Sequence, residues 1–124
     1  MPTRKLRATP PSTTLRPTKT LPELPLKDFR RWCRVIRKLC PTKDPVSIRR
    51  VDLPLDRIGD CSWIDGVWHI RISKWIDRAA TAETIVHEWT HALRDESAEP
   101  FEADHDATYW QIYGKVWCAF YGES

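Results

Sequence analysis

The sequence lacks the long apolar segments that would place it in a membrane or direct it out of the cell. It contains no run of about 18 apolar residues, the length that a transmembrane helix requires. The N-terminus also lacks the apolar stretch and the cleavage site of a secretory signal. These absences predict a soluble cytoplasmic protein with no membrane partner.

Closely spaced cysteine pairs and internal repeats are missing as well. The four cysteines are scattered, with no C-x-x-C pair, which excludes a zinc ribbon and a thioredoxin-type redox site. We expect Cys33, Cys40, Cys61 and Cys118 to be reduced, buried thiols. No repeated segment indicates a solenoid or propeller.

What the chain does contain fits one small domain. It has 124 residues, of which 41% are hydrophobic and seven are tryptophan. This length is typical of a single domain, and the bulky side chains suffice for a core without cross-links. One functional site is therefore expected.

Charge is distributed unevenly along the chain. Residues 1–50 hold 14 Lys or Arg and 3 Asp or Glu, whereas residues 51–124 hold 6 and 14. Residues 1–22 consist largely of Pro, Thr, Lys and Arg, so they have too little apolar surface to offset the entropy lost on ordering. We predict a disordered basic tail over residues 1–22 and a folded domain over residues 23–124.

The first predicted element is an amphipathic helix over residues 26–39. Its apolar residues recur at three- and four-residue spacing, and Pro25 and Pro41 bound it. The opposite face is basic and, with the tail, could contact the phosphates of nucleic acid non-specifically. An ordinary solvated helix face would carry the same pattern.

A small sheet is predicted next. Residues 46–51 are β-branched and alternate loosely, residues 53–60 are expected to form a loop, and residues 61–72 are divided by the turn pair Asp65-Gly66. In the second arm of this hairpin Trp68, Ile70 and Ile72 share one face, which should meet the core.

Two further helices complete the prediction. Apolar spacing indicates helices over about residues 79–94 and 106–121, separated by an acidic loop over residues 95–104. The expected fold class is therefore α+β, with an N-terminal helix, a three-stranded sheet that includes the hairpin, and two C-terminal helices.

The strongest functional motif is His87-Glu88-Trp89-Thr90-His91, which lies within the first of these two helices. A four-residue spacing places both imidazoles on one helix face, so that both can bind one metal ion. Glu88 then lies beside the metal as the expected general base. Shuffling this composition would produce such a motif only on the order of once in a hundred times.

A hydrolytic zinc site needs a third protein ligand, and His105 is the preferred candidate. The acidic loop is long enough to return residue 105 to the motif helix, and Asp104 or Asp106 could orient the imidazole. Carboxylates could ligate instead: Glu99, Glu102, Asp104 or Asp106. The chain does not match the metzincins, because their motif has glycine three residues after the second histidine and this chain has Arg94 there.

One further histidine and two tyrosines are weaker candidates for a role at the site. His69 lies mid-strand on the face opposite Trp68, so we expect it to be structural. Tyr109 and Tyr113 lie close in sequence to His105 and could donate a hydrogen bond to an oxyanion, although core aromatic residues need no such role.

The segments Thr84–Leu93 and Asp104–Gly114 together resemble the SprT-like and phage-type minimal zinc metallopeptidase domains, which are HExxH zincins of the gluzincin-like kind. The resemblance covers about residues 26–121. It implies a zincin-like fold, Zn²⁺ on His87, His91 and His105, and Glu88 as general base. It further implies that an edge strand around Val67–Ile72 holds a peptide substrate, and, for a phage protein, location in the host cytoplasm.

The chain departs from this family at two places. Asp106-Ala107 stands where many members have Gly-Pro, and the following cysteine zinc ribbon is absent. The prediction is a zinc metallopeptidase that hydrolyses peptide bonds with metal-activated water. The alternatives are a basic nucleic-acid-binding module with a structural or vestigial zinc site, and a zinc hydrolase acting on a non-peptide bond.

Overall fold

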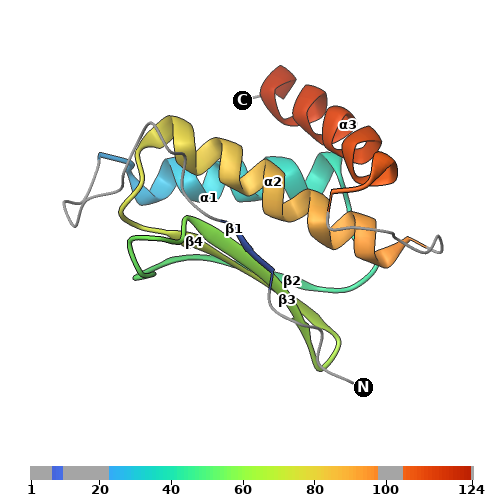
Figure 1. Cartoon of the computed structure of the whole chain (residues 1–124). Helices are drawn as coiled ribbons and strands as arrows, with labels where there is room; N and C mark the ends of the chain where they lie inside the picture. The colour runs from blue at the N-terminus through green and yellow to red at the C-terminus, as the bar shows by residue number, and fades with distance from the viewer. Residues whose placement is uncertain (1–6, 10–22, 98–104, 124) are drawn as a thin grey trace.

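The expected α+β fold is confirmed, with helices on one side of a mixed sheet (Figure 1). The structure is a computed structural model and describes residues 7–9, 23–97 and 105–123. In chain order its elements are β1 (Arg7–Thr9), α1 (Leu26–Leu39), β2 (Val46–Val51), β3 (Gly59–Ile64), β4 (Val67–Ser73), α2 (Arg78–Glu96) and α3 (Ala107–Glu123).

The predicted hairpin forms at the predicted turn. Asp65 and Gly66 both adopt positive φ angles, 51° and 82°, as the two central residues of a type I′ turn do. β3 and β4 pair antiparallel from Gly59 opposite Ile72 to Ile64 opposite Val67. The expected loop over residues 53–60 is therefore wrong at its end, because residues 59 and 60 already belong to β3.

The strand order is β1-β3-β4-β2, which makes β4 an inner strand. β2 runs parallel to β4 from Val46 opposite Trp68 to Val51 opposite Ser73. The expectation that the strand around Val67–Ile72 is an edge is therefore wrong, since pairing with β2 covers the side that the hairpin leaves open. Peptide addition to this strand would require one of its two ladders to open.

A short fourth strand joins the three that were expected. β1 pairs antiparallel with β3, with Arg7 opposite Cys61 and Thr9 opposite Gly59. The prediction of disorder over residues 1–22 is thus wrong for residues 7–9, whose backbone is paired. The rest of that segment lies outside the described residues.

The core lies between the sheet and the helices. Trp68, Ile70 and Ile72 of β4 are buried as predicted and meet residues of α1 and α2, among them Ile36 and Ile85. α3 packs on α1 and α2 on the side away from the sheet (Figure 1). α2, the helix that carries the histidine motif, is therefore packed between the sheet on one side and α3 on the other.

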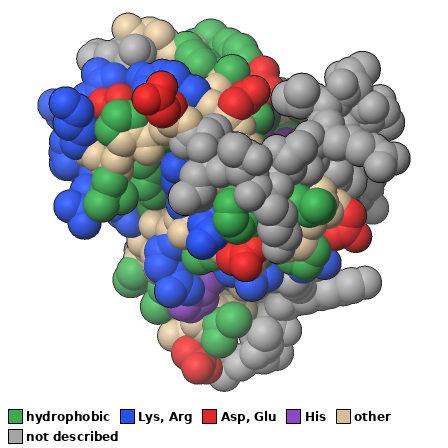
Figure 2. Space-filling view, turned by 90° about the vertical axis from the view of Figure 1, so that its left-hand side faces the viewer, with side chains coloured by type: hydrophobic (Ala, Val, Ile, Leu, Met, Phe, Trp, Pro, Cys, Tyr) green, Lys and Arg blue, Asp and Glu red, His purple; other side chains and the backbone are tan. Residues whose placement is uncertain are grey.

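The surface is strongly basic along α1. The side chains exposed there include Lys27, Arg30, Arg31, Arg34, Arg37 and Lys38. Figure 2 shows Lys and Arg side chains gathered at the upper left of the molecule, on the side where α1 lies. No helix among the described residues is long and apolar enough to span a membrane.

Candidate metal centre

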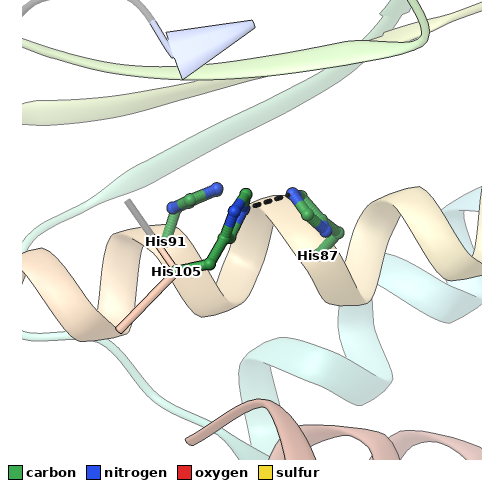
Figure 3. A group of neighbouring side chains, drawn as sticks. All are labelled: His87, His91 and His105. Atoms are coloured by element: carbon green, nitrogen blue, oxygen red, sulfur yellow. Dashed lines mark hydrogen bonds between the residues drawn. The ribbon is translucent and has the colours of Figure 1, made fainter. Parts of the chain in front are cut away.

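The motif helix α2 carries two of the expected ligands. Its first turn is capped by the Asp77 side chain, which accepts a hydrogen bond from Ala80 N at 2.8 Å. The helix continues without a break to Glu96, so His87 and His91 lie one turn apart on the same face. Both imidazoles project toward the strands (Figure 3).

His105 reaches the same place from the segment before α3, and lies between the other two in Figure 3. One ligand atom from each histidine lies within 4.8 Å of the others. The Nε2 atoms of His105 and His87 are 3.3 Å apart. The ring centroids are 5.0 Å apart for His87 and His91, 5.0 Å for His87 and His105, and 4.9 Å for His91 and His105.

This spacing fits a tetrahedral metal ion. Zinc–nitrogen bonds of about 2.0–2.1 Å place two tetrahedral ligands roughly 3.3 Å apart, as the His87 and His105 nitrogen atoms are. Three imidazoles also leave a fourth position open, which is the donor set of hydrolytic zinc sites. The three side chains therefore form a donor set that can share one metal ion.

The protonation state of His87 suits metal binding. Burial lowers the pKa of this imidazole to about 4, and the neighbouring His105 lowers it further in the same direction. His87 is therefore neutral at neutral pH even without a metal ion. Only the neutral ring has a lone pair for a metal.

The ring of Tyr109 packs against all three histidines. Its ring centroid lies 4.7 Å from that of His91, 4.8 Å from that of His105 and 5.7 Å from that of His87. The side chain is fully buried, and its hydroxyl donates a hydrogen bond to the His87 carbonyl at 3.0 Å. The phenol proton is thus used to join α3 to α2, rather than aimed at an oxyanion.

An ion pair fixes the position of His105. Arg94, one turn beyond His91 and only 1% exposed, donates to Asp106 Oδ1 at 3.0 Å and to Oδ2 at 2.6 Å. Asp106 Oδ1 also accepts from Tyr109 N at 2.8 Å, which caps the start of α3. Asp106 therefore acts on His105 through the backbone, whereas the sequence suggested a bond to the imidazole or direct ligation.

Glu88 lies in the contact between α2 and β3. Its side chain is fully buried. A Cβ atom added to Gly59 would lie 3.4 Å from Glu88 Cγ, 2.6 Å from Thr84 Cγ2 and 3.1 Å from the Arg71 carbonyl oxygen. Glycine at residue 59 therefore lets β3 approach the helix at the residue predicted to be the general base.

Among the described residues, the metal-ligating cluster consists of the three histidines alone. Of the described residues, only His87, His91 and His105 form a group of three or more side chains able to share a metal ion. His69 belongs to β4 and is half-buried, outside the cluster, as expected. Glu99, Glu102 and Asp104 lie outside the described residues.

Sequence reasoning missed Arg94 and Gly59. Arg94 follows His91 by three residues and so shares its helix face, which was a usable signal because a buried face rarely carries an unpaired arginine. Gly59 lay inside a segment expected to be a loop, where glycine is unremarkable.

Comparisons with known proteins do not assign a family, so the inference about function depends on the geometry of the site. No protein-family model matches the sequence, and searches of curated proteins and of solved structures found no match.

Proposed function

We propose that this chain is a zinc-dependent metallopeptidase of the SprT-like, minimal zincin kind. The observation that carries the proposal is the convergence of His87, His91 and His105, with Glu88 directly after the first histidine. Three imidazoles around one point, with an adjacent carboxylate, are the parts that metal-assisted hydrolysis requires.

When bound, a zinc ion would supply a water with a pKa lowered to about 7 and a Lewis acid for the scissile carbonyl. Glu88 is the residue placed to accept a proton and to return it to the amine that leaves. Its burial against β3 limits the exchange of protons between the carboxylate and bulk water.

The backbone beside Glu88 favours a peptide as substrate. β3 passes the helix at Gly59, and its outer side is the one that β1 pairs with, over Gly59, Asp60 and Cys61. An extended peptide in the place of β1 would form the same ladder, as in recognition by strand addition. We therefore propose that a peptide substrate pairs with the edge of β3, in place of β4.

The first test is the zinc content of the purified chain. We expect about one zinc per chain in the wild type and a sharp loss in His91→Ala and His105→Ala. His69→Ala is the matched control, because it removes an imidazole outside the cluster and should leave the zinc content unchanged. Wild-type protein without zinc would overturn the metal centre.

The second test separates catalysis from metal binding. Glu88→Gln should keep the zinc but lower the rate of cleavage of unfolded protein substrates by about 10²–10⁴-fold, the usual contribution of a general base. If the wild-type protein binds zinc but cleaves no peptide, the metallopeptidase proposal is overturned. The remaining explanations would then be a structural zinc site or a hydrolase that acts on non-peptide bonds.

A further inference from the structure

A groove between α1 and β2 is separate from the metal centre and has a composition of its own. Its volume is about 490 Å³. Five of the residues that line it are arginines: Arg30, Arg34, Arg37, Arg49 and Arg50. The remaining four, Leu26, Phe29, Cys33 and Ile48, are apolar. The lining has no carboxylate.

The arginines are not used for ion pairs within the described part of the chain. The ion pairs found there join Arg57 and Arg71 to Asp60, Arg78 to Asp28, and Arg94 to Asp106. α1 and β2 together carry eight Lys or Arg and one acidic residue, Asp28. Such a concentration of charge is costly to hold without counter-ions, and it attracts a polyanion.

Two of the five arginines maintain the shape of the groove. Arg37 donates to the Val46 carbonyl at 2.8 Å, which ties the end of α1 to the start of β2. Arg50 donates to the Lys74 carbonyl at 3.2 Å and to that of Ile76 at 3.4 Å. The other three, Arg30, Arg34 and Arg49, are exposed and can meet a ligand.

The floor is apolar and uncharged at neutral pH. Phe29, Cys33 and Ile48 are all buried. Burial raises the pKa of the Cys33 thiol to about 11, although Arg37 and Arg34 nearby oppose the shift. The groove therefore combines guanidinium groups along its sides with a surface on which a flat apolar group can rest.

We propose that this groove binds the phosphodiester backbone of a single-stranded nucleic acid. Arg30 and Arg34 are one helical turn apart, about 6 Å, close to the separation of successive phosphates on an extended strand. Guanidinium groups recognise phosphate oxygens in bidentate fashion, and an apolar floor accepts an unstacked base. One strand, rather than a duplex with two backbones, fits a groove between a helix and a strand edge.

The test is the binding of a fluorescent 12-nucleotide oligothymidylate to the full chain, followed by anisotropy over a range of salt concentrations. Arg30→Gln, Arg34→Gln and Arg49→Gln are combined in one variant. We expect at least tenfold weaker binding at low salt. The slope of log affinity against log salt should fall in magnitude by about 2, since each phosphate contact on a single strand contributes about 0.7.

The matched control removes three charges from the same helix outside the groove. It combines Lys27→Gln, Arg31→Gln and Lys38→Gln, and should retain nearly wild-type affinity and slope. Equal losses of affinity in both variants would mean that binding depends only on the overall positive charge of the surface. That result would overturn the groove as the binding site. No binding by the wild type, or equal competition by polyglutamate, would overturn it too. Neither result bears on the metal centre.

Discussion

Arg94 and Asp106 form a nearly buried ion pair that connects the metal-site helix to the first turn of α3. The side chains are 2% and 11% exposed, and the pair has a short contact of 2.6 Å from Arg94 to Asp106 Oδ2. Because Asp106 directly follows His105, this pair determines where the third imidazole lies. A residue outside the histidine cluster thus completes the candidate metal centre.

Replacing Asp106 should therefore weaken zinc binding. Asp106→Ala removes the carboxylate that pairs with the buried Arg94 guanidinium, at a cost of about 3–5 kcal/mol in the free energy of unfolding. It should also lower zinc affinity by about 10–100-fold, as the loss of outer-shell partners does. Denaturant unfolding and competition with a chelator measure the two effects.

Asp28→Ala is the control for this variant. It removes the partner of Arg78, whose side chain is 49% exposed, from a pair at 3.0 Å far from the histidines. An exposed pair contributes about 0–1 kcal/mol. Equal zinc affinity in both variants would contradict the role given to Asp106.

Gly59 should tolerate no side chain. In Gly59→Ala the new methyl group would meet Thr84 Cγ2 at 2.6 Å, so α2 or β3 must shift. We expect a loss of about 1–3 kcal/mol in the free energy of unfolding from this overpacking, and a lower rate of peptide cleavage because Glu88 moves with the helix.

Gly114→Ala is the matched substitution in α3. A Cβ atom there meets nothing within 4 Å, and alanine is the better helix former by about 0.5–1 kcal/mol. This variant should be as stable as the wild type or more so. A neutral effect at Gly59 as well would mean that β3 does not approach α2 so closely.

Tyr109→Phe distinguishes a structural phenol from a catalytic one. It removes the hydrogen bond to the His87 carbonyl, which should lower the free energy of unfolding by about 1–3 kcal/mol. An oxyanion donor would instead cost about 10²–10³-fold in kcat. We expect a change in kcat below tenfold, with Tyr121→Phe, on the exposed side of α3, as the control.

Removing β1 should free the edge of β3 beside the metal centre. A chain that begins at residue 10 loses the strand paired with Gly59, Asp60 and Cys61, whereas one that begins at residue 7 keeps it. If peptides bind at this edge, the shorter chain should cleave them severalfold faster, with a lower KM. Hydrogen exchange at Cys61 checks the loss of pairing independently, and equal rates for both chains would argue against this edge.

Thiol reactivity should differ between the cysteines and depend on pH. All four are free thiols, with Cys118 exposed and Cys33 and Cys61 buried. Because burial raises the pKa of Cys33 to about 11, its reactive thiolate is scarce at pH 8 and increases only as the pH approaches 11. A disulfide-exchange reagent at pH 8 should modify Cys118 first and Cys33 only after unfolding.

The sequence by itself determined the local structure and half of the site. Periodicity gave α1 over Leu26–Leu39 with its observed bounds, and the positive φ angles of Asp65 and Gly66 formed the predicted turn. The spacing of His87 and His91 needs only a helix to bring them together. These features depend on interactions within a few residues, which a sequence pattern records.

The tertiary structure decided what depends on contacts between distant segments. Where His105 lies follows from the Arg94 pair with Asp106, and the close approach of Gly59 to Glu88 follows from how the sheet packs on α2. The parallel pairing of β2 with β4 moved the sheet edge away from the hairpin. Such pairings gain their free energy only from the assembled core, so no local pattern in the chain specifies them.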